Sequence, residues 1–249
     1  MKLKKKFYIE LFFLIFLGVL TSLSLPPFNY VVVNFLTFSL FYIFLIKKIT
    51  FYKNKKIFFI YGWFFGFGYF VSNLYWISIS LTFDQNFKFL IPFTIILIPG
   101  FLALFYALVA YLFVVLKPNN NLSSFFLFSL IFGVVEFARG SILTGFPWNL
   151  IAYSFSTQIE ILNITSVIGT YSFNLFCISL FTSPSIFILR ENKKDISICV
   201  AFLITTMLFF ILGSQNLEKF NNQQEKKLVY KLRILSSNIS IDRFYKNID

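Results

Sequence analysis

Long apolar runs alternate with short polar segments along residues 1–213 of the chain. A helix rises 1.5 Å per residue, so a run as long as Phe7 to Leu25 reaches about 29 Å, close to the thickness of the hydrocarbon core of a bilayer. The pattern predicts seven transmembrane helices, and the short fifth one can be extended by the turn that contains Glu136. Their expected ranges are Phe7–Leu25, Tyr30–Ile46, Ile57–Leu81, Leu90–Leu116, Ser123–Phe137, Ile161–Leu189 and Ile196–Leu212.

The composition agrees with an all-α multi-pass membrane protein. Hydrophobic residues make up 58% of the chain, 39 of the 249 residues are Phe, and only 13% are charged. The net charge of +12 would suggest nucleic-acid binding in a soluble protein. Here the basic residues cluster in the short gaps between apolar runs, as the positive-inside rule expects, so we predict a membrane topology signal and no nucleic-acid partner.

The basic residues mark alternate gaps, which predicts the orientation of the chain. Two of the intervening loops, Thr82–Phe89 and Ala138–Glu160, carry only Lys88 and Arg139. Because cytoplasmic loops are rich in Lys and Arg, we expect a cytoplasmic N-terminus and, after seven spans, a tail outside the cytoplasm from Gly213 onward. The residues expected on the cytoplasmic side are Lys2, Lys4, Lys5, Lys6, Lys47, Lys48, Lys53, Lys55, Lys56, Lys117, Arg190, Lys193 and Lys194.

The first apolar run has a second interpretation. Four lysines precede it and the small residues Ser22 and Ser24 follow it, as in a secretory signal peptide. The run is long and bulky, however, and Pro26-Pro27 comes directly after it, which is typical of a turn. We therefore favour a retained helix.

The residue types of common catalytic centres are absent or misplaced. The chain has no His, which excludes a Ser-His-Asp triad and most zinc sites. Its two cysteines, Cys177 and Cys199, fall inside predicted spans, where a free Cys behaves as a small hydrophobic residue. We expect no metal site, no cofactor and no catalytic residue within this sequence.

Three segments combine polar, glycine and aromatic residues at the ends of apolar runs. The first is Ser24–Phe28, the second is Gly62–Phe70 followed by Asn73 and Trp76, and the third is Glu136–Trp148, continuing to Tyr153 and Ser154. Polar groups near lipid are costly, and this cost favours a functional role for the third segment.

Each segment also has a purely structural interpretation. The glycines Gly62, Gly66 and Gly68 suit close packing between helices, which we favour over contact with lipid. Trp76, Trp148 and Tyr153 could anchor the chain at the interface, and Glu136 and Arg139, three residues apart, could neutralise one another. The functional alternative is that Arg139 binds a phosphate beside a rigid Pro-Trp pair. We predict a lipid-binding site formed by Glu136, Arg139, Pro147, Trp148 and Trp76.

In this order, the three segments resemble bacterial apolipoprotein N-acyltransferases. The family string T-G-F-P-W is matched at Thr144–Trp148, and the preceding E-x-x-R-G is matched at Glu136–Gly140. The third segment is highly specific for the family, whereas the other two only support the assignment. The family's functional Trp of this motif falls on Trp148.

The resemblance implies a fold, a reaction and a location. The family joins a transmembrane bundle to a periplasmic nitrilase-like α/β domain in the bacterial inner membrane. A Glu-Lys-Cys triad there takes an acyl chain from a phospholipid as a thioester and passes it to the N-terminal Cys of a diacylglyceryl-lipoprotein. The implied partners are therefore a membrane phospholipid as donor and the lipoprotein as acceptor.

The end of the sequence departs from this pattern. We divide the chain into a membrane domain (1–213), a linker (214–227) and the start of a nitrilase-like domain (228–249). Ser236–Ile239 loosely matches the opening strand of that domain, and Tyr245 stands where the family usually has Trp. No Glu-Lys-Cys triad maps onto the sequence, which favours a truncated, split or incompletely sequenced gene.

The main alternative is a non-catalytic membrane protein that binds lipid or scaffolds a separately encoded acyltransferase domain. A secondary transporter fits less well, because we find no internal repeat and no charged residue deep in a run.

Overall fold

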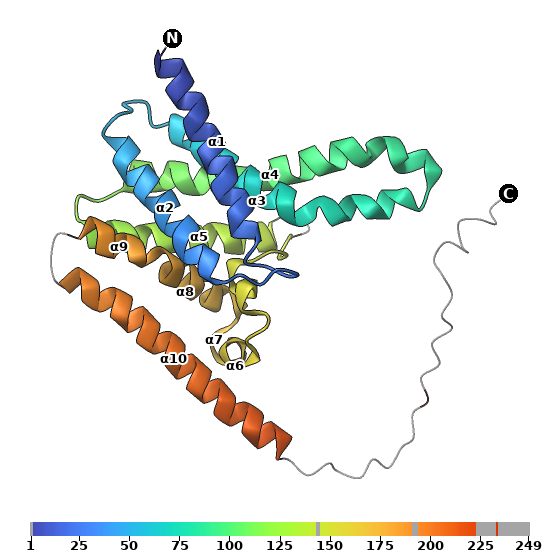
Figure 1. Ribbon diagram of the computed structural model, residues 1–249, viewed down its shortest axis with the longest axis vertical. Helices are drawn as coiled ribbons and strands as arrows, with labels where there is room; N and C mark the ends of the chain where they lie inside the picture. Colours follow the sequence, from blue (N-terminus) through green and yellow to red (C-terminus); the bar gives the residue numbers. More distant parts are fainter. Residues whose placement is uncertain (1, 143–144, 191–193, 223–232, 234–249) are drawn as a thin grey trace.

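A computed structural model describes residues 2–142, 145–190, 194–222 and 233, and this part of the chain is helical without strands (Figure 1). Long helices alternate with short ones, and the short elements η1, η2 and η3 are 3₁₀ helices. The elements are α1 (Lys2–Ser22), α2 (Val32–Ile49), α3 (Ile57–Leu74), η1 (Tyr75–Thr82), η2 (Gln85–Leu90), α4 (Ile91–Leu116), α5 (Asn121–Ser141), η3 (Ile151–Phe155), α6 (Ile159–Leu162), α7 (Thr165–Ile168), α8 (Thr170–Thr182), α9 (Pro184–Leu189) and α10 (Lys194–Asn221).

Within the described residues, six helical segments are long and apolar enough to cross a membrane. They contain α2, α3 with η1, η2 with α4, α5, α8 with α9, and α10. The helix α1 is not among them, since lysines occupy its start and Glu10 interrupts its apolar residues. An all-α membrane protein is therefore confirmed, whereas the count of seven spans stays a prediction.

Two expected boundaries need comment. The fifth helix reaches Ser141, so the turn with Glu136 does extend it. The start of the sixth span at Ile161 is wrong, because the helical segment long and apolar enough to cross a membrane is Thr170–Leu189, and the apolar residues before it form the short helices α6 and α7. The break falls at Gly169, whose φ of +81° lies in the left-handed region that glycine adopts without strain.

Glycines allow α3 to lie against two other helices at backbone distance. A Cβ atom on Gly62 would overlap the carbonyl oxygen of Tyr106 on α4, and one on Gly68 would overlap that of Ile15 on α1. Gly18 of α1 is equally close to the backbone of α3. Helices in lipid associate through such close packing rather than through the hydrophobic effect. The packing interpretation of the glycines is thus confirmed.

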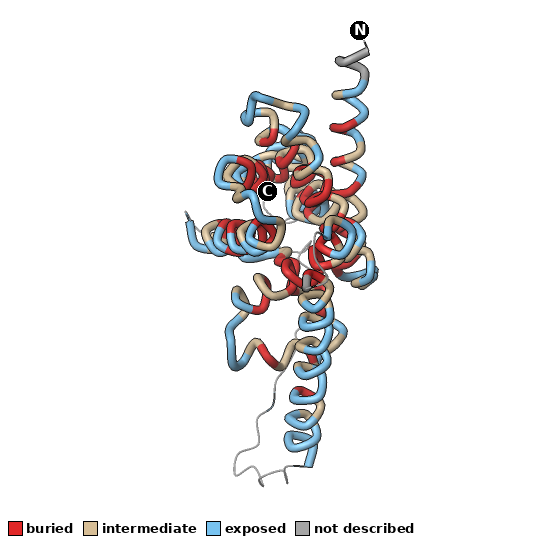
Figure 2. Tube along the Cα trace, turned by 90° about the vertical axis from the view of Figure 1, so that its left-hand side faces the viewer, coloured by how far each residue is buried: buried red, intermediate tan, exposed pale blue. Residues whose placement is uncertain are grey.

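Aromatic side chains fill the space between the remaining helices. Phe41 of α2 stacks on Phe65 of α3 with ring centroids 4.1 Å apart and an interplanar angle of 9°. Phe128 and Phe132 of α5 reach into the same cluster and are fully buried. In Figure 2 the buried residues lie along the inner sides of the helices, whereas α10, at the lower end, is mostly exposed.

The end of the bundle that holds the start of α1 contains a buried ionic network. Lys48 of α2 donates to the carboxylate of Glu10 on α1 and forms an ion pair with it. The hydroxyls of Tyr52 and Tyr61 donate to the other carboxylate oxygen, the former at 3.0 Å. The network joins α1, α2 and α3.

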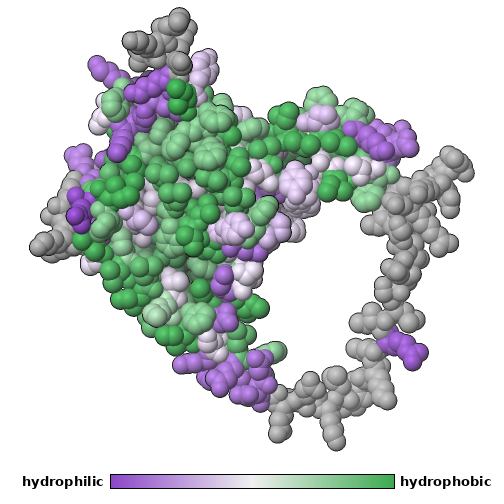
Figure 3. Space-filling model, viewed as in Figure 1, coloured by the Kyte–Doolittle hydropathy of each residue, from purple (hydrophilic) through white to green (hydrophobic). Residues whose placement is uncertain are grey.

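The segments that were expected in the cytoplasm lie along one side of the molecule. The start of α1, the α2–α3 and α4–α5 connections, the end of α9 and the start of α10 occupy the top and left of Figure 1. The ends of α1, α3 and α5 lie away from them, since each of these helices starts at that side. Figure 3 shows hydrophilic side chains at the margins of a broad apolar surface. Which side faces the cytoplasm stays a prediction.

The helix α10 continues to Asn221, so the first residues of the expected linker, Ser214–Asn221, are helical. The expected nitrilase-like segment 228–249 lies, except for Arg233, outside the described residues.

Candidate functional site

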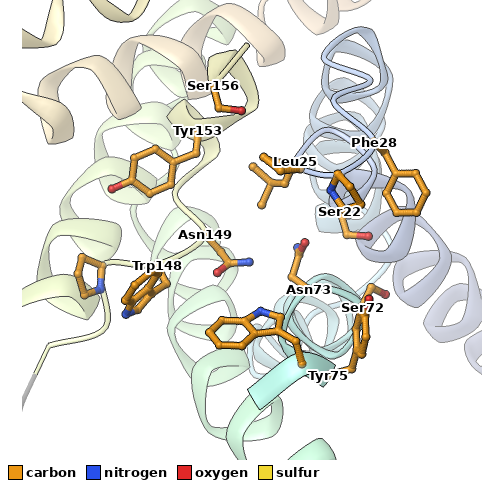
Figure 4. A pocket seen from close by; sticks show the side chains of 14 residues that line it. Ser22, Leu25, Phe28, Ser72, Asn73, Tyr75, Trp148, Asn149, Tyr153 and Ser156 are labelled. Atoms are coloured by element: carbon orange, nitrogen blue, oxygen red, sulfur yellow. The ribbon is translucent and has the colours of Figure 1, made fainter. Parts of the chain in front are cut away.

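The three segments singled out in the sequence meet at one cavity, at the end of the bundle away from the basic loops. The cavity has a volume of about 670 Å³. The turn after α1, the end of α3 with the start of η1, and the loop between α5 and η3 form its walls (Figure 4). The lining residues are Ser22, Leu25, Pro26, Pro27, Phe28, Ser72, Asn73, Tyr75, Trp76, Pro147, Trp148, Asn149, Tyr153 and Ser156.

Two tryptophans lie beside each other in the lining of this cavity. Trp76 is on η1 and Trp148 on the loop after α5, with ring centroids 6.5 Å apart and an interplanar angle of 68°. They are 47% and 59% exposed, so both rings are available to a ligand. An edge-to-face pair of this kind is a favourable geometry for two indoles. Pro147, next to Trp148, is also exposed and lines the cavity.

Arg139 and Glu136, the charged pair of the third segment, do not line this cavity. Both side chains are fully buried, and they form an ion pair with hydrogen bonds of 2.7 and 3.2 Å. The Nη1 atom of Arg139 donates to the carbonyl oxygens of Phe146 and Trp148, at 2.7 and 2.9 Å. The guanidinium also lies over the ring of Phe70, 5.3 Å from its centroid. The pair therefore fixes the loop that carries Trp148.

Part of the same loop bends at a glycine. Gly145 has a φ of +71°, and a Cβ atom there would overlap the carbonyl oxygen of Gly140. Phe146 then donates its N–H to the carbonyl oxygen of Arg139, at 3.0 Å. The backbone bend thus explains why the family string has a glycine at this position, followed by Phe-Pro-Trp. Thr144, the first residue of the string, lies outside the described residues.

Comparison with known proteins points to one family. Residues 17–183 match the sequence profile of the apolipoprotein N-acyltransferase N-terminal domain. The chain belongs to the apolipoprotein N-acyltransferase family. A Rhodopseudomonas palustris apolipoprotein N-acyltransferase is 36% identical over 174 residues, which is 69% of this chain and 32% of the relative. A Rickettsia prowazekii protein of the same name is 32% identical over 194 residues, covering 77% of this chain and 38% of the relative. The matched region thus spans about a third of each relative.

The resemblance to apolipoprotein N-acyltransferases rested on segments that line or support the same cavity. Ser24–Phe28 contributes its last four residues to the lining, the second segment contributes Asn73 and Trp76, and the third contributes Pro147 and Trp148. Arg139 lies instead at a second, smaller cavity of about 310 Å³ between α4 and the loop. The remaining lining of this second cavity consists of Leu97, Ile98, Phe101, Leu102, Phe105, Ile142, Gly145 and Phe146.

The polar groups of the large cavity are uncharged. The side chains of Asn73 and Asn149 point into the same space from opposite walls (Figure 4), and Asn73 is held by donating to the carbonyl oxygen of Tyr69 at 3.1 Å. Burial raises the pKa of the Tyr153 hydroxyl, which therefore stays protonated at neutral pH and can donate a hydrogen bond. The cavity thus offers neutral donors beside an aromatic and aliphatic wall.

The cysteines lie away from this site. Cys177 is fully buried on α8, and the thiol of Cys199 on α10 donates to the carbonyl oxygen of Ser183 at 3.0 Å. Among the described residues, no group of His, Cys, Asp and Glu could hold a metal ion.

Sequence analysis missed two residues that hold the loop in this family member. The Tyr69 hydroxyl donates to the carbonyl oxygen of Asn149 at 2.8 Å, and Asn174 Oδ1 accepts from the N–H of Ala152 at 2.9 Å. Asn174 could have been found as an amide inside an apolar run, where an unpaired polar group is costly.

Proposed function

We propose that this chain forms the membrane-embedded part of an apolipoprotein N-acyltransferase and that its large cavity binds the phospholipid acyl donor. The observation that carries the proposal is that three segments, far apart in the sequence, line one cavity at a single end of the bundle. The intact protein would transfer the acyl chain to the N-terminal Cys of a diacylglyceryl-lipoprotein. The proposed location is the bacterial inner membrane.

The cavity chemistry supports a phospholipid ligand. Leu25, Phe28 and the two tryptophans offer an apolar wall suited to acyl chains. The neutral donors Asn73, Asn149 and Tyr153 lie beside this wall, where ester and phosphate oxygens of a bound lipid could accept hydrogen bonds. A pocket that combines apolar walls with a few polar groups is the usual form of a small-ligand site.

The proposed roles of the predicted residues follow from their positions. Trp76, Trp148 and Pro147 contact the lipid at the cavity wall. Arg139 and Glu136 act indirectly, because the guanidinium is already used by one carboxylate and two backbone carbonyls. Of the two roles considered for Arg139, binding a phosphate or neutralising Glu136, this geometry favours the second, and the guanidinium also holds the loop backbone.

We assign no residue of this chain to the acyl-transfer reaction itself. The Glu-Lys-Cys triad that the resemblance implies does not map onto the sequence, and the described cysteines are in helices away from the cavity. Lipid binding without catalysis, in support of a separately encoded acyltransferase domain, would use the same cavity.

Photocrosslinking tests the proposal directly. The purified chain is placed in phosphatidylethanolamine and phosphatidylglycerol vesicles that contain a phospholipid with a photoreactive acyl chain, and adducts are mapped by mass spectrometry. We expect adducts concentrated on lining residues such as Phe28 and Trp76, and severalfold fewer in Trp148→Ala than in Phe51→Ala. Phe51 is a suitable control because it is an exposed aromatic residue in the α2–α3 loop, at the opposite end. Adducts spread evenly over lipid-facing residues such as Leu203 would overturn the assignment.

A further inference from the structure

The backbone of the loop that carries Trp148 is held by buried polar side chains from three helices. Four hydrogen bonds from buried polar side chains reach the backbone between Phe146 and Ala152. Two come from Arg139 on α5, one comes from Tyr69 on α3, and one goes to Asn174 on α8. Three helices therefore meet at this loop, each through one polar side chain.

Tyr69 and Asn174 place their polar atoms at the middle and at the end of this loop segment. Both residues are fully buried. The Tyr69 hydroxyl donates a hydrogen bond to the carbonyl oxygen of Asn149. The φ of Asn149 is +58°, which is uncommon for a residue other than glycine. Asn174 binds the N–H of Ala152, at the start of η3. These bonds hold the chain on the far side of Trp148 from the carbonyl of Phe146.

The helix α3 connects this loop to the opposite wall of the cavity. Its Tyr69 ring stacks on Tyr106 of α4, with centroids 5.8 Å apart and an interplanar angle of 14°, so the position of the hydroxyl is set by packing between helices. The next residue, Phe70, supports the guanidinium of Arg139. Trp76 follows on η1, which continues directly from α3. The helix α3 with its continuation η1 thus carries Trp76 and also holds the loop that carries Trp148.

From this arrangement we infer that Tyr69 and Asn174 are positioning residues that fix Trp148 beside Trp76 at the wall of the cavity. Neither residue lines the cavity, so each acts on a ligand only through the loop. The inference rests on the proposed function in one respect, namely that the fixed tryptophan contacts a phospholipid. The positioning itself is independent of what the cavity binds.

The test follows Trp148 by its own fluorescence. The chain has three tryptophans, so Trp63→Phe and Trp76→Phe leave Trp148 as the only one. In this background, Tyr69→Phe removes one hydroxyl and keeps the packed ring, and Asn174→Leu removes the acceptor for Ala152. The control is Tyr42→Phe, which makes the same chemical change at a buried tyrosine that packs against Phe113 and Phe128 on other helices.

We expect the fluorescence anisotropy of Trp148 in vesicles to be lower in Tyr69→Phe and Asn174→Leu than in Tyr42→Phe, at equal helical content by circular dichroism. Equal anisotropy in Tyr69→Phe and Tyr42→Phe would overturn the inference. The lipid measurement uses the Trp63→Phe protein, which retains both cavity tryptophans. Adding phosphatidylethanolamine to this detergent-solubilised protein should raise its tryptophan anisotropy, and roughly threefold to tenfold more lipid should be needed when Tyr69→Phe is added, which corresponds to one lost hydrogen bond. If lipid has no effect on this anisotropy while Tyr69→Phe still lowers that of Trp148, the proposed function fails and the positioning role stands.

Discussion

The Arg139 guanidinium and the Glu136 carboxylate form a two-point ion pair within the last turns of α5, with both side chains fully excluded from the surface. Because each is the charge partner of the other, removing one leaves a buried charge without compensation, which typically costs about 3–5 kcal/mol. We therefore expect Arg139→Ala to lower the thermal stability of the detergent-solubilised chain markedly.

Arg190→Ala is the matched control for that measurement. Arg190 is exposed and lies over the ring of Phe187, and substitutions at such surface positions usually change stability by less than about 0.5 kcal/mol. The double variant Glu136→Met with Arg139→Met should recover part of the loss, since it removes both charges at once. Equal melting temperatures for the two arginine variants would show that the pair does not hold the loop.

A second prediction concerns Trp148 in a catalytic context. A chimera would continue this chain with the remaining part of the Rickettsia prowazekii relative, whose matched region covers 38% of that protein. We expect Trp148→Ala to reduce acyl transfer to a diacylglyceryl lipopeptide by about one to two decades, if the tryptophan contacts the donor in the transition state. The comparison is with Phe51→Ala at matched membrane abundance, and equal turnover would reduce Trp148 to an interfacial anchor.

Glu10 should be important for the assembly of the first three helices. Its carboxylate accepts hydrogen bonds from Lys48, Tyr52 and Tyr61, so Glu10→Ala leaves the buried Tyr61 hydroxyl without this acceptor, at a cost of about 1–3 kcal/mol, and removes the ion pair with Lys48. Limited proteolysis in vesicles should then release α1 faster than in Glu218→Ala, which removes an exposed carboxylate of α10. Identical proteolysis rates would argue that glycine packing alone holds α1.

The cysteines should not carry an acyl group. Cys177 is fully buried on α8, and Cys199 already donates to a backbone carbonyl. Incubation of the chain with a radiolabelled phospholipid should give no hydroxylamine-sensitive label, because a thioester needs an accessible thiolate. A labelled peptide that contains either cysteine would contradict this expectation.

The orientation can be tested with topology reporters. Thirteen Lys and Arg residues lie in the segments expected in the cytoplasm, against Lys88 and Arg139 in two of the intervening loops. A reporter that is active only outside the cytoplasm should work after Gly213 and fail after Lys53 or Lys193. Reporter activity after Lys53 would show that the predicted orientation is inverted. A reporter that is inactive after both Lys53 and Gly213 would favour an even number of spans before Gly213.

Six of the expected spans and the family were predictable from the sequence, because both depend on local signals. Continuous apolar runs gave most helices, and the string Glu136–Gly140 with its Phe-Pro-Trp gave the family. The boundary before α8 was wrong for a physical reason: residues 159–168 are as apolar as a span, yet α6 and α7 are short helices that end at Gly169. Hydropathy alone does not distinguish these two arrangements.

The roles within the site were less predictable. The main partners of Arg139, apart from Glu136, are backbone carbonyls, and any sequence supplies those, so no residue pattern reveals that the guanidinium is already occupied. The same holds for Tyr69 and Asn174, which bind the loop through its backbone. Convergence of the three segments on one cavity also depends on tertiary packing.

The glycine contacts of α3 have a consequence for which substitutions the protein tolerates. Because α1, α3 and α4 meet backbone to backbone at Gly18, Gly62 and Gly68, no side chain lies between them at these points that could change its rotamer to make room. The three helices are therefore fixed relative to one another, and this packing sets the positions of Ser72 and Asn73 at the end of α3. Substitutions of one large residue by another on the lipid-facing side should leave the cavity unchanged. A single methyl group added at one of these glycines would instead push two helices apart and displace the cavity residues at the end of α3.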